Sequence, residues 1–518
     1  MRKLKAIYFA PALAVIALIA WALASPIGAA PDDDFHLVST WCATDSAYCK
    51  PGESSATRVV PEALVHPHCY AQDALQSAAC QDNISWTEAP SVETKRGNFV
   101  GAYPPVYYAV MNVFAGEDLL SSALLMRLVN VLLFVGLTTA LFVLLPAVRR
   151  PTLIWTWLVT TLPMGVFILS SNNPSSWAVM GLGTGWLALL GYLETSGRPK
   201  WLLGAVFAVA TLMAAGSRGD AAMYAILGIA AVFVLTVPWS KAERTAAAWK
   251  RYGLDAILPA VMTIVCAVLF LSSRQTQSGI GGFGGDTSVS GAAVGVGNAE
   301  AALSGFSLLA YNLLNIPFLW AGNFGEWGLG WLDTPMPSIV PFAAVAALVA
   351  IGFSGLGRLW GRKLVVTIGV GLVLWLLPVY VLQQGGDTLG EAVQPRYILP
   401  LLVLFVGLVL LGRAGQMLRF SRPQLALVSG ALILVNFIAL HFNMRRYLTG
   451  IGVQGGNLDA GYEWWWDLAI SPASVWIIGS IAYAALVIVL TYQVGWLGRG
   501  PSTELSKSER SQQKQLAD

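Results

Sequence analysis

The amino-acid sequence predicts an all-α, polytopic integral membrane protein with about twelve transmembrane helices. Of its 518 residues, 56% are hydrophobic and only 11% are charged, whereas about a quarter of the residues in a soluble domain carry a charge. Apolar runs of membrane-spanning length recur along the whole chain. Lysine and arginine concentrate in alternate loops between these runs, as the positive-inside rule requires. These observations exclude an ordinary soluble fold.

The expected spans are the apolar runs bounded by polar or basic loops. They lie at about 6–24, 119–145, 152–170, 175–193, 200–216, 220–238, 254–271, 338–355, 364–382, 396–412, 424–442 and 473–493. With both termini placed inside, the cytoplasmic segments carry 21 of the 31 Lys and Arg but only 6 of the 28 Asp and Glu. This bias predicts a multi-pass protein of the cell membrane with cytoplasmic N- and C-termini.

The first apolar run follows Arg2, Lys3 and Lys5, and it has two interpretations. Small residues at 25–30 are compatible with cleavage of a signal peptide. The run is, however, nearly long enough to span a bilayer, and further spans with a matching charge bias follow it. We therefore favour a retained membrane anchor.

Residues 1–500 are expected to form one transmembrane domain, which includes an extracytoplasmic loop at 26–102 and an outer loop at 272–336. The Gly-rich stretch 279–297 within the outer loop is either a mobile flap or a disordered linker. The polar segment 501–518 is expected to be a disordered cytoplasmic tail.

Four cysteines, Cys42, Cys49, Cys69 and Cys80, lie in the first loop. In an exported loop they predict two disulfides with three possible pairings. Four free thiols are the alternative. His66 and His68 lie next to Cys69, but they predict no metal centre, because no second pair of ligands follows at zinc-site spacing.

An acidic cluster, Asp32, Asp33 and Asp34 with His36, directly follows the first span. Adjacent carboxylates repel one another, which can raise the pKa of at least one. One carboxylate could act as a general base on an acceptor hydroxyl, or help to bind a divalent cation. The alternative is a solvated run of charge at the exit of a helix.

Three arginines, Arg127, Arg218 and Arg396, fall at the expected outer ends of spans, where the positive-inside rule makes them exceptions. A guanidinium group suits bidentate binding of phosphate. The functional interpretation is a site for a lipid-linked phosphate. The alternatives are pairing with outer acids such as Asp220, or contact with ordinary lipid headgroups.

No Walker A motif, dinucleotide fingerprint or HExxH sequence occurs, so coupling to nucleotide hydrolysis is not indicated. No nucleic-acid partner is expected either. The polar turn at Asn172, Asn173 and Pro174 is ordinary turn chemistry when it is considered alone.

Several segments, taken in order, resemble the DUF2142 family of predicted bacterial membrane proteins. They are Ser25-Pro26-Ile27-Gly28, Pro31-Asp32-Asp33 with His36, Tyr103-Pro104-Pro105-Val106-Tyr107-Tyr108, Arg127 with Asn130, Asn172-Asn173-Pro174, and Arg396-Tyr397 with Pro400. Asp33 stands where the family has Glu, and Asp34 stands where it has Pro. That family looks like a branch of the GT-C glycosyltransferase fold.

In GT-C enzymes, an acidic pair after the first span lies at the active site, and the sugar donor is usually a polyprenyl phosphate. The resemblance therefore implies catalytic roles for Asp32, Asp33 and His36. The substrate-binding residues that we expect are Tyr103, Arg127, Asn172, Asn173, Arg218, Asp220, Arg396 and Tyr397.

The expected function is an extracytoplasmic glycosyltransferase that uses a polyprenyl-phosphate sugar and a cell-envelope glycan or other acceptor. Its cofactor is unknown, and a divalent cation is compatible with the acidic cluster. One alternative is a transporter or flippase of lipid-linked glycans, which needs polar residues at mid-membrane depth. Few charges fall at span centres, which favours the enzyme. A non-enzymatic protein of cell-envelope assembly is the third possibility.

Overall fold

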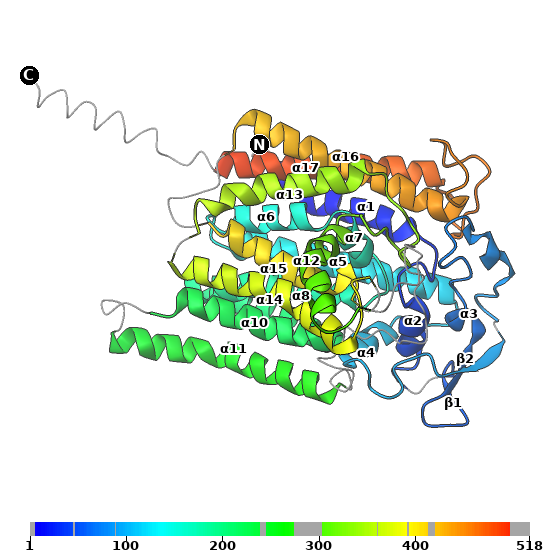
Figure 1. The fold of residues 1–518 in the computed structure, drawn as a ribbon, viewed down its shortest axis with the longest axis horizontal. Coiled ribbons are helices and arrows are strands. Elements are labelled where there is room, and N and C mark those ends of the chain that lie inside the picture. Colours follow the sequence, from blue (N-terminus) through cyan, green and yellow to red (C-terminus); the bar gives the residue numbers. More distant parts are fainter. Residues whose placement is uncertain are drawn as a thin grey trace, which may run out of the picture.

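The computed structural model describes residues 6–44, 47–88, 90–238, 245–273, 303–359, 361–390, 393–412 and 420–497. Long helices lie side by side, with smaller elements gathered at one end of the bundle (Figure 1). We call this end, which carries α2 (Asp33–Trp41), α3 (Glu62–Val65), α4 (Val106–Asn112) and a small sheet, the loop end. The expected flap at 279–297 and the expected tail at 501–518 lie outside the described residues.

The bundle helices are α1 (Ala10–Leu23, preceded by the 3-10 turn η1, Ala6–Phe9), α5 (Leu119–Leu144), α6 (Arg150–Thr160), α7 (Met164–Leu169), α8 (Ser175–Glu194), α9 (Arg198–Ser217), α10 (Gly219–Thr236), α11 (Ala246–Ser272), α12 (Gly305–Gly322), α13 (Ile339–Leu356), α14 (Gly361–Gly385), α15 (Pro395–Leu410), α16 (Arg422–Leu448) and α17 (Pro472–Leu497). Within the described ranges, ten of these are long and apolar enough to cross a membrane: α1 with η1, α5, α8, α9, α10, α11, α13, α14, α16 and α17.

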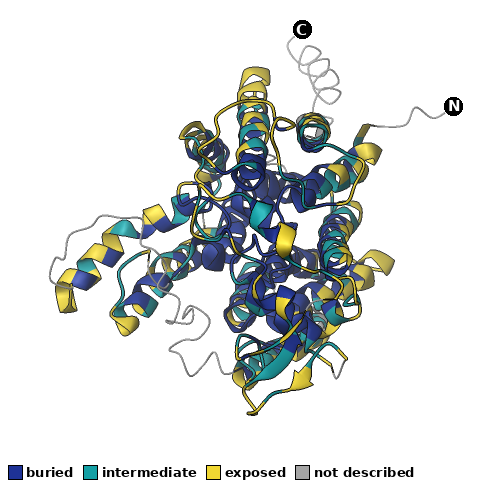
Figure 2. Cartoon of the chain, turned by 90° about the vertical axis from the view of Figure 1, so that its right-hand side faces the viewer, coloured by how far each residue is buried: buried dark blue, intermediate teal, exposed yellow. Residues whose placement is uncertain are grey.

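The outer faces of the peripheral helices carry large exposed apolar side chains, such as Leu271, Phe353 and Leu427. Figure 2, which looks at the loop end, shows the buried residues gathered in the centre of the bundle and the exposed ones around it. Exposed apolar surface of this extent is unfavourable in water but suits lipid. The chain is therefore a multi-pass membrane protein, as its composition predicted.

Two of the twelve expected spans take a different form. The run at 152–170 is broken into α6 and α7 because Pro163 has no N–H with which to continue the helical hydrogen bonds. The run at 396–412 is α15, a helix of 16 residues. All three helices are almost entirely buried, together with α8, at the centre of the bundle. Protein rather than lipid surrounds them, so the bilayer thickness does not set their lengths.

The first loop folds against the loop end of the bundle. It contains α2 (Asp33–Trp41), α3 (Glu62–Val65), the 3-10 turn η2 (Ala78–Asn83), and an antiparallel sheet of β1 (Lys50–Pro51), β2 (Arg58–Pro61) and β3 (Ser91–Thr94) in the order β1-β2-β3. Val60 of β2 pairs with Val92 of β3. The short helix α4 (Val106–Asn112) follows the loop, within the segment that begins at Tyr103.

The two predicted disulfides are confirmed, and the structure selects one pairing of the three. Cys42 pairs with Cys49, and Cys69 pairs with Cys80. The first bond ties the end of α2 to the start of the sheet. The second closes the segment between α3 and η2, so both bonds restrain the loop that covers the candidate site.

Candidate active site

Asp32 lies between α1 and α2 in a backbone conformation that directs its side chain away from the helix it precedes. It is the N-cap residue of α2, yet its side chain caps no backbone N–H of that helix. Its φ of 60° is in the left-handed region, which aspartate tolerates better than most residues but which still carries a cost. The carboxylate is thereby free to contact side chains from other parts of the chain.

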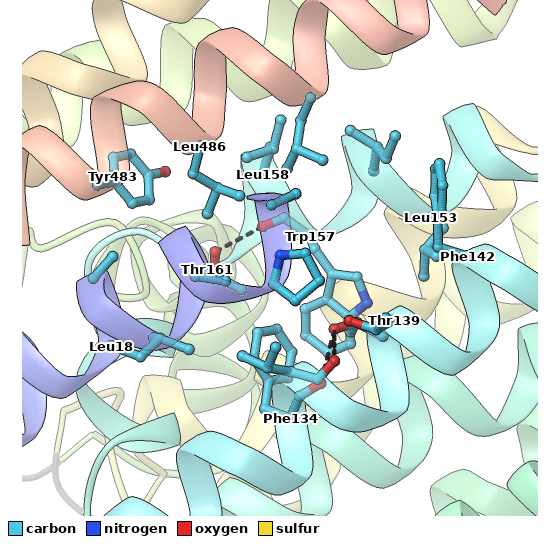
Figure 3. Close-up of a pocket in the computed structure, with 18 of the residues that line it drawn as sticks. Leu18, Phe134, Thr139, Phe142, Leu153, Trp157, Leu158, Thr161, Tyr483 and Leu486 are labelled. Carbon is cyan, nitrogen blue, oxygen red and sulfur yellow. Dashed lines mark hydrogen bonds between the residues drawn. The ribbon is translucent and has the colours of Figure 1, made fainter. Parts of the chain in front are cut away.

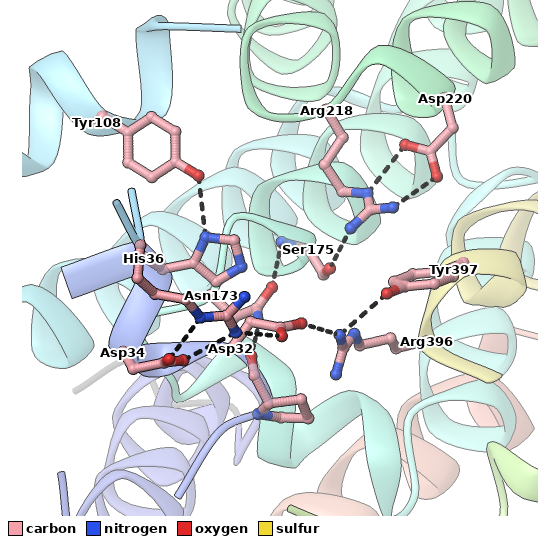
Figure 4. Close-up of polar contacts among 12 residues, drawn as sticks. Asp32, Asp34, His36, Tyr108, Asn173, Ser175, Arg218, Asp220, Arg396 and Tyr397 are labelled. Carbon is pink, nitrogen blue, oxygen red and sulfur yellow. Dashed lines mark hydrogen bonds and ion pairs between the residues drawn. The ribbon is translucent and has the colours of Figure 1, made fainter. Parts of the chain in front are cut away.

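Two arginines from distant segments bind the Asp32 carboxylate, and Figure 4 shows the contact with Arg396. Arg396, in the first turn of α15, donates from Nη2 to Oδ2 at 2.6 Å, and Arg96 donates from Nη2 to Oδ1 at 3.1 Å. Burial opposes ionisation of Asp32, but the positive charge of Arg396, and also that of Arg96, outweighs it and holds the pKa below its usual value. Asp32 is therefore a carboxylate at neutral pH.

Arg96 reaches the site from the loop that follows β3. Its backbone N–H donates to the Thr94 hydroxyl at the end of β3. Its guanidinium also holds Asp34, with Nε 2.6 Å from Oδ2. The sheet and α2 thus position one cation between two carboxylates of the acidic cluster.

A second ion pair, between Arg218 and Asp220, lies beside the contact between Arg396 and Asp32. Arg218, between α9 and α10, binds both oxygens of Asp220 at 2.9 Å. The Tyr397 ring lies between two guanidinium groups, 4.4 Å from Cζ of Arg218 and 5.0 Å from Cζ of Arg396. The Tyr397 hydroxyl accepts from Arg396 at 3.1 Å. Arg218, Asp220, Arg396 and Tyr397, which the sequence nominated separately, therefore form one cluster with Asp32. Asp220 does neutralise Arg218, as the alternative interpretation anticipated.

His36 and the tyrosines form an aromatic wall of this cluster. The Nδ1 atom of His36 is 2.9 Å from the Tyr108 hydroxyl, and the Tyr103 ring packs edge-on against the imidazole at 5.4 Å. Cζ of Arg218 lies 5.8 Å from the centre of the Tyr103 ring. Burial lowers the pKa of His36 to about 3, although the Asp32 charge acts in the opposite direction. His36 is therefore neutral at physiological pH and carries no positive charge that could bind an anion. Its contacts with Tyr108 and Tyr103 support a role in orienting these side chains.

Asp33 points away from the cluster, although it is adjacent to Asp32 in sequence. Its Oδ2 accepts from the backbone N–H groups of Gly28 and Ala30 at 3.2 and 3.3 Å, so it braces the turn between α1 and α2. Burial raises its pKa to about 7, and the nearby Asp34 charge contributes less. The predicted increase in one carboxyl pKa is thus present, but burial is its main cause rather than repulsion among the three acids.

Arg127, Asn172 and Asn173 have three different environments. Arg127, buried in α5, donates to the backbone carbonyls of Ala22, Ser25 and Pro26, and these contacts support a structural role rather than the expected phosphate contact. Asn173 donates to the Pro31 carbonyl next to Asp32. Both side-chain polar atoms of Asn172 are buried without a partner among the described residues.

The sequence did not identify Arg96, Tyr108 and Ser175 as members of the site. Asp34 was part of the predicted acidic cluster but not one of the expected catalytic residues. Ser175 lies 3.4 Å from Arg218, on the opposite side of that guanidinium from Asp220 (Figure 4). Arg96 carried only a signal that it shares with Lys50, Arg58 and Lys95, which is a basic residue in a loop expected on the outer face. The roles of Tyr108 and Ser175 have no comparable signal, because their contacts depend on how α2, α4 and α8 pack.

Exposure is uneven across the cluster. The Asp32 side chain is 31% exposed, whereas those of Arg396 and Arg218 are 3% and 2% exposed. Nε and Nη1 of Arg396 are buried and have no partner among the described residues. A buried, unpaired N–H group of an ion is costly, so these groups point to an anionic or oxygen-rich ligand. Within the described ranges, no group of three or more His, Cys, Asp or Glu side chains is arranged to hold a metal ion.

Fold and site together define a polytopic helical membrane protein with an ionic cluster at one end of its bundle. The chain belongs to the DUF2142 family, described as "Predicted membrane protein", which it matches over residues 15–405, or 391 of its 518 residues. The matched range contains every member of the cluster, which confirms the family resemblance noted in the sequence. No curated protein and no solved structure matches the chain.

Proposed function

We propose that this protein is an extracytoplasmic glycosyltransferase of GT-C type, located in the cell membrane with both termini in the cytoplasm. It would transfer a sugar from a polyprenyl-phosphate donor to a hydroxyl of a cell-envelope glycan or other acceptor. The observation that carries the proposal is the contact between Asp32 and Arg396. It joins a partly exposed carboxylate to a buried guanidinium whose Nε and Nη1 have no partner in the described part of the chain, at the loop end of a transmembrane bundle.

The reaction needs an anion site for the departing phosphate, because negative charge develops on the phosphate oxygen as its bond to the anomeric carbon breaks. Arg396 is suited to this task, since Nη1 and Nε can donate to phosphate while Nη2 holds Asp32. Arg218 adds a second positive charge behind the Tyr397 ring, although Asp220 offsets part of it. Arg127 has no part in this step.

The acceptor hydroxyl would approach Asp32 from the exposed side of the cluster. Its oxygen forms the new bond to the anomeric carbon, and the polyprenyl phosphate leaves from the opposite face, so a single displacement inverts the anomeric centre. The low pKa makes Asp32 a weak base. Its main task is then to accept the hydroxyl hydrogen bond and orient the attacking oxygen, with the proton passing to water.

Proteoliposomes that contain the full chain test this proposal with radiolabelled polyprenyl-phosphate sugars and a crude cell-envelope acceptor. We expect label in the acceptor and release of polyprenyl phosphate in equal amounts. A nucleotide sugar should donate nothing. If the labelled lipid crosses the bilayer without loss of its sugar, the transporter alternative is correct and the transferase proposal is wrong.

A further inference from the structure

An apolar cavity lies in the half of the bundle that is remote from the loop end. It has a volume of about 260 Å³ and lies between α1, the C-terminal half of α5, α6 and α17. Figure 3 shows Leu18, Phe134, Phe142 and Leu158 directed into this space. A dry apolar cavity of about 150 Å³ is already large enough to bind benzene. The cavity therefore has room for a segment of a hydrocarbon chain.

Two threonine side chains of the wall direct their hydroxyl hydrogens to backbone carbonyls. The hydroxyls of Thr138 and Thr161 donate to carbonyls of their own helices, those of Phe134 and Trp157. Tyr8 and Val143, which also line the cavity, are exposed on the outer surface of the bundle. Because that surface faces lipid, the molecule with direct access to the cavity is a membrane lipid.

Arg150, the first residue of α6, lies next to residues of the cavity wall, although it is not itself part of that wall. Its Nη2 and Nε donate to the carbonyls of Val143 and Leu145, which leaves Nη1 for a ligand, and its Cζ lies 5.0 Å from the ring of Phe142. Val143 and Phe142 line the cavity. Among the described residues Arg150 forms no salt bridge, whereas the neighbouring Arg149 pairs with Glu194. Arg150 is partly exposed, so an anionic headgroup can reach it.

We infer that this cavity binds an anionic phospholipid, with one acyl chain between α1, α5, α6 and α17 and the headgroup phosphate on Arg150. The charge of Arg150 and the apolar wall match the two parts of such a molecule. The inference is independent of the proposed transferase activity.

The test uses delipidated, full-length protein in detergent and measures binding of phosphatidylglycerol by native mass spectrometry. Arg150→Gln should weaken binding by about tenfold, the effect of one charge-assisted hydrogen bond to phosphate. Arg198→Gln is the matched control, because Arg198 also begins a helix, precedes a proline and lies away from the cavity. It should leave binding unchanged.

A second pair of variants tests the chain-binding part of the cavity. Ala14→Phe places a ring in the cavity and should also weaken binding by about tenfold, whereas Ala12→Phe lies on the exposed face of the same helix and should have no effect. Equal affinities for each variant and its control would overturn the inference. So would equal affinity for phosphatidylcholine, or displacement of phosphatidylglycerol by substoichiometric polyprenyl phosphate. The arginine pair remains informative if Ala14→Phe fails to fold.

Discussion

Replacing Asp32 by Asn separates the chemical role of this residue from its structural role. The amide keeps the size of the side chain and one acceptor oxygen, but it removes the charge that pairs with Arg96 and Arg396. Loss of charge in such hydrogen bonds costs about 1–3 kcal/mol. Because the Asp32 side chain is 31% exposed, water screens the pair, and the stability loss should be near the lower value, about 1 kcal/mol.

Transfer activity should fall far more than stability. A hydrogen bond from the attacking hydroxyl to a carboxylate is worth about 1.5–3 kcal/mol, which is roughly ten- to a hundredfold in rate. Asp32→Asn should therefore lose about 90% to 99% of the transfer from radiolabelled polyprenyl-phosphate sugar in proteoliposomes. The midpoint of thermal unfolding should decrease only slightly.

Asp34→Asn is the matched control. Asp34 lies two residues away and also pairs with Arg96, at 2.6 Å, but it makes no contact with Arg396. This variant should keep at least about a tenth of the activity. Wild-type activity in Asp32→Asn would refute the assignment of Asp32. An equal loss in both variants would show that the charge balance around Arg96 matters and that Asp32 has no specific role.

Four further outcomes follow from the contacts. Asp33 has a folded-state pKa near 7, above its usual value near 4, so the folded state holds more protons than the unfolded state between these two pH values. The stability of the folded state should therefore fall as the pH rises through this window. Asp33→Asn should show a smaller difference between its unfolding midpoints at pH 5 and pH 8 than the wild type. Arg396→Lys should raise the KM for the donor by about tenfold or more, with a smaller change in kcat. The reason is that an ammonium group cannot hold Asp32 and Tyr397 and still present fixed N–H groups to phosphate. An unchanged KM would show that Arg396 does not bind the donor. Arg127→Met leaves three buried carbonyls without their hydrogen-bond donor, which should lower the midpoint of thermal unfolding by several degrees. The protein that remains folded should keep the wild-type KM for the donor. A rise in KM without a loss of stability would contradict the structural role of Arg127. Cys80→Ser should destabilise the protein by about 3 kcal/mol, which is the loop-entropy value for cysteines eleven residues apart. A reducing agent should lower the midpoint of thermal unfolding less in this variant than in the wild type.

The transmembrane architecture was largely predictable because hydropathy is a local property. Each of ten expected spans coincides with one long apolar helix. One of the two remaining spans also has a local cause, because Pro163 divides the run at 152–170 into α6 and α7. That these helices and α15 are enclosed by protein could not be predicted from their composition, because lipid-facing and buried helices in a membrane are both apolar.

The site residues illustrate the limit of local reasoning. Arg127, Arg218 and Arg396 carried the same signal, an arginine at an expected outer end of a span. Arg396 contacts Asp32 and Arg218 flanks Tyr397, but Arg127 donates to three backbone carbonyls. Arg96 has the same exceptional character in the first loop and proved to bind Asp32 directly.

The sequence by itself determined that this protein crosses a membrane repeatedly, that one loop carries two disulfides, and that unusual charges lie near span ends. Those properties depend on the composition of short segments. Only the tertiary structure decided that Asp32 and Arg396, 364 residues apart, are in contact. It also decided that Asp32 and Asp33 point in different directions. The reason is physical: a left-handed turn and the packing of α2 against distant helices set the directions of these side chains, and neither leaves a periodic pattern in the sequence.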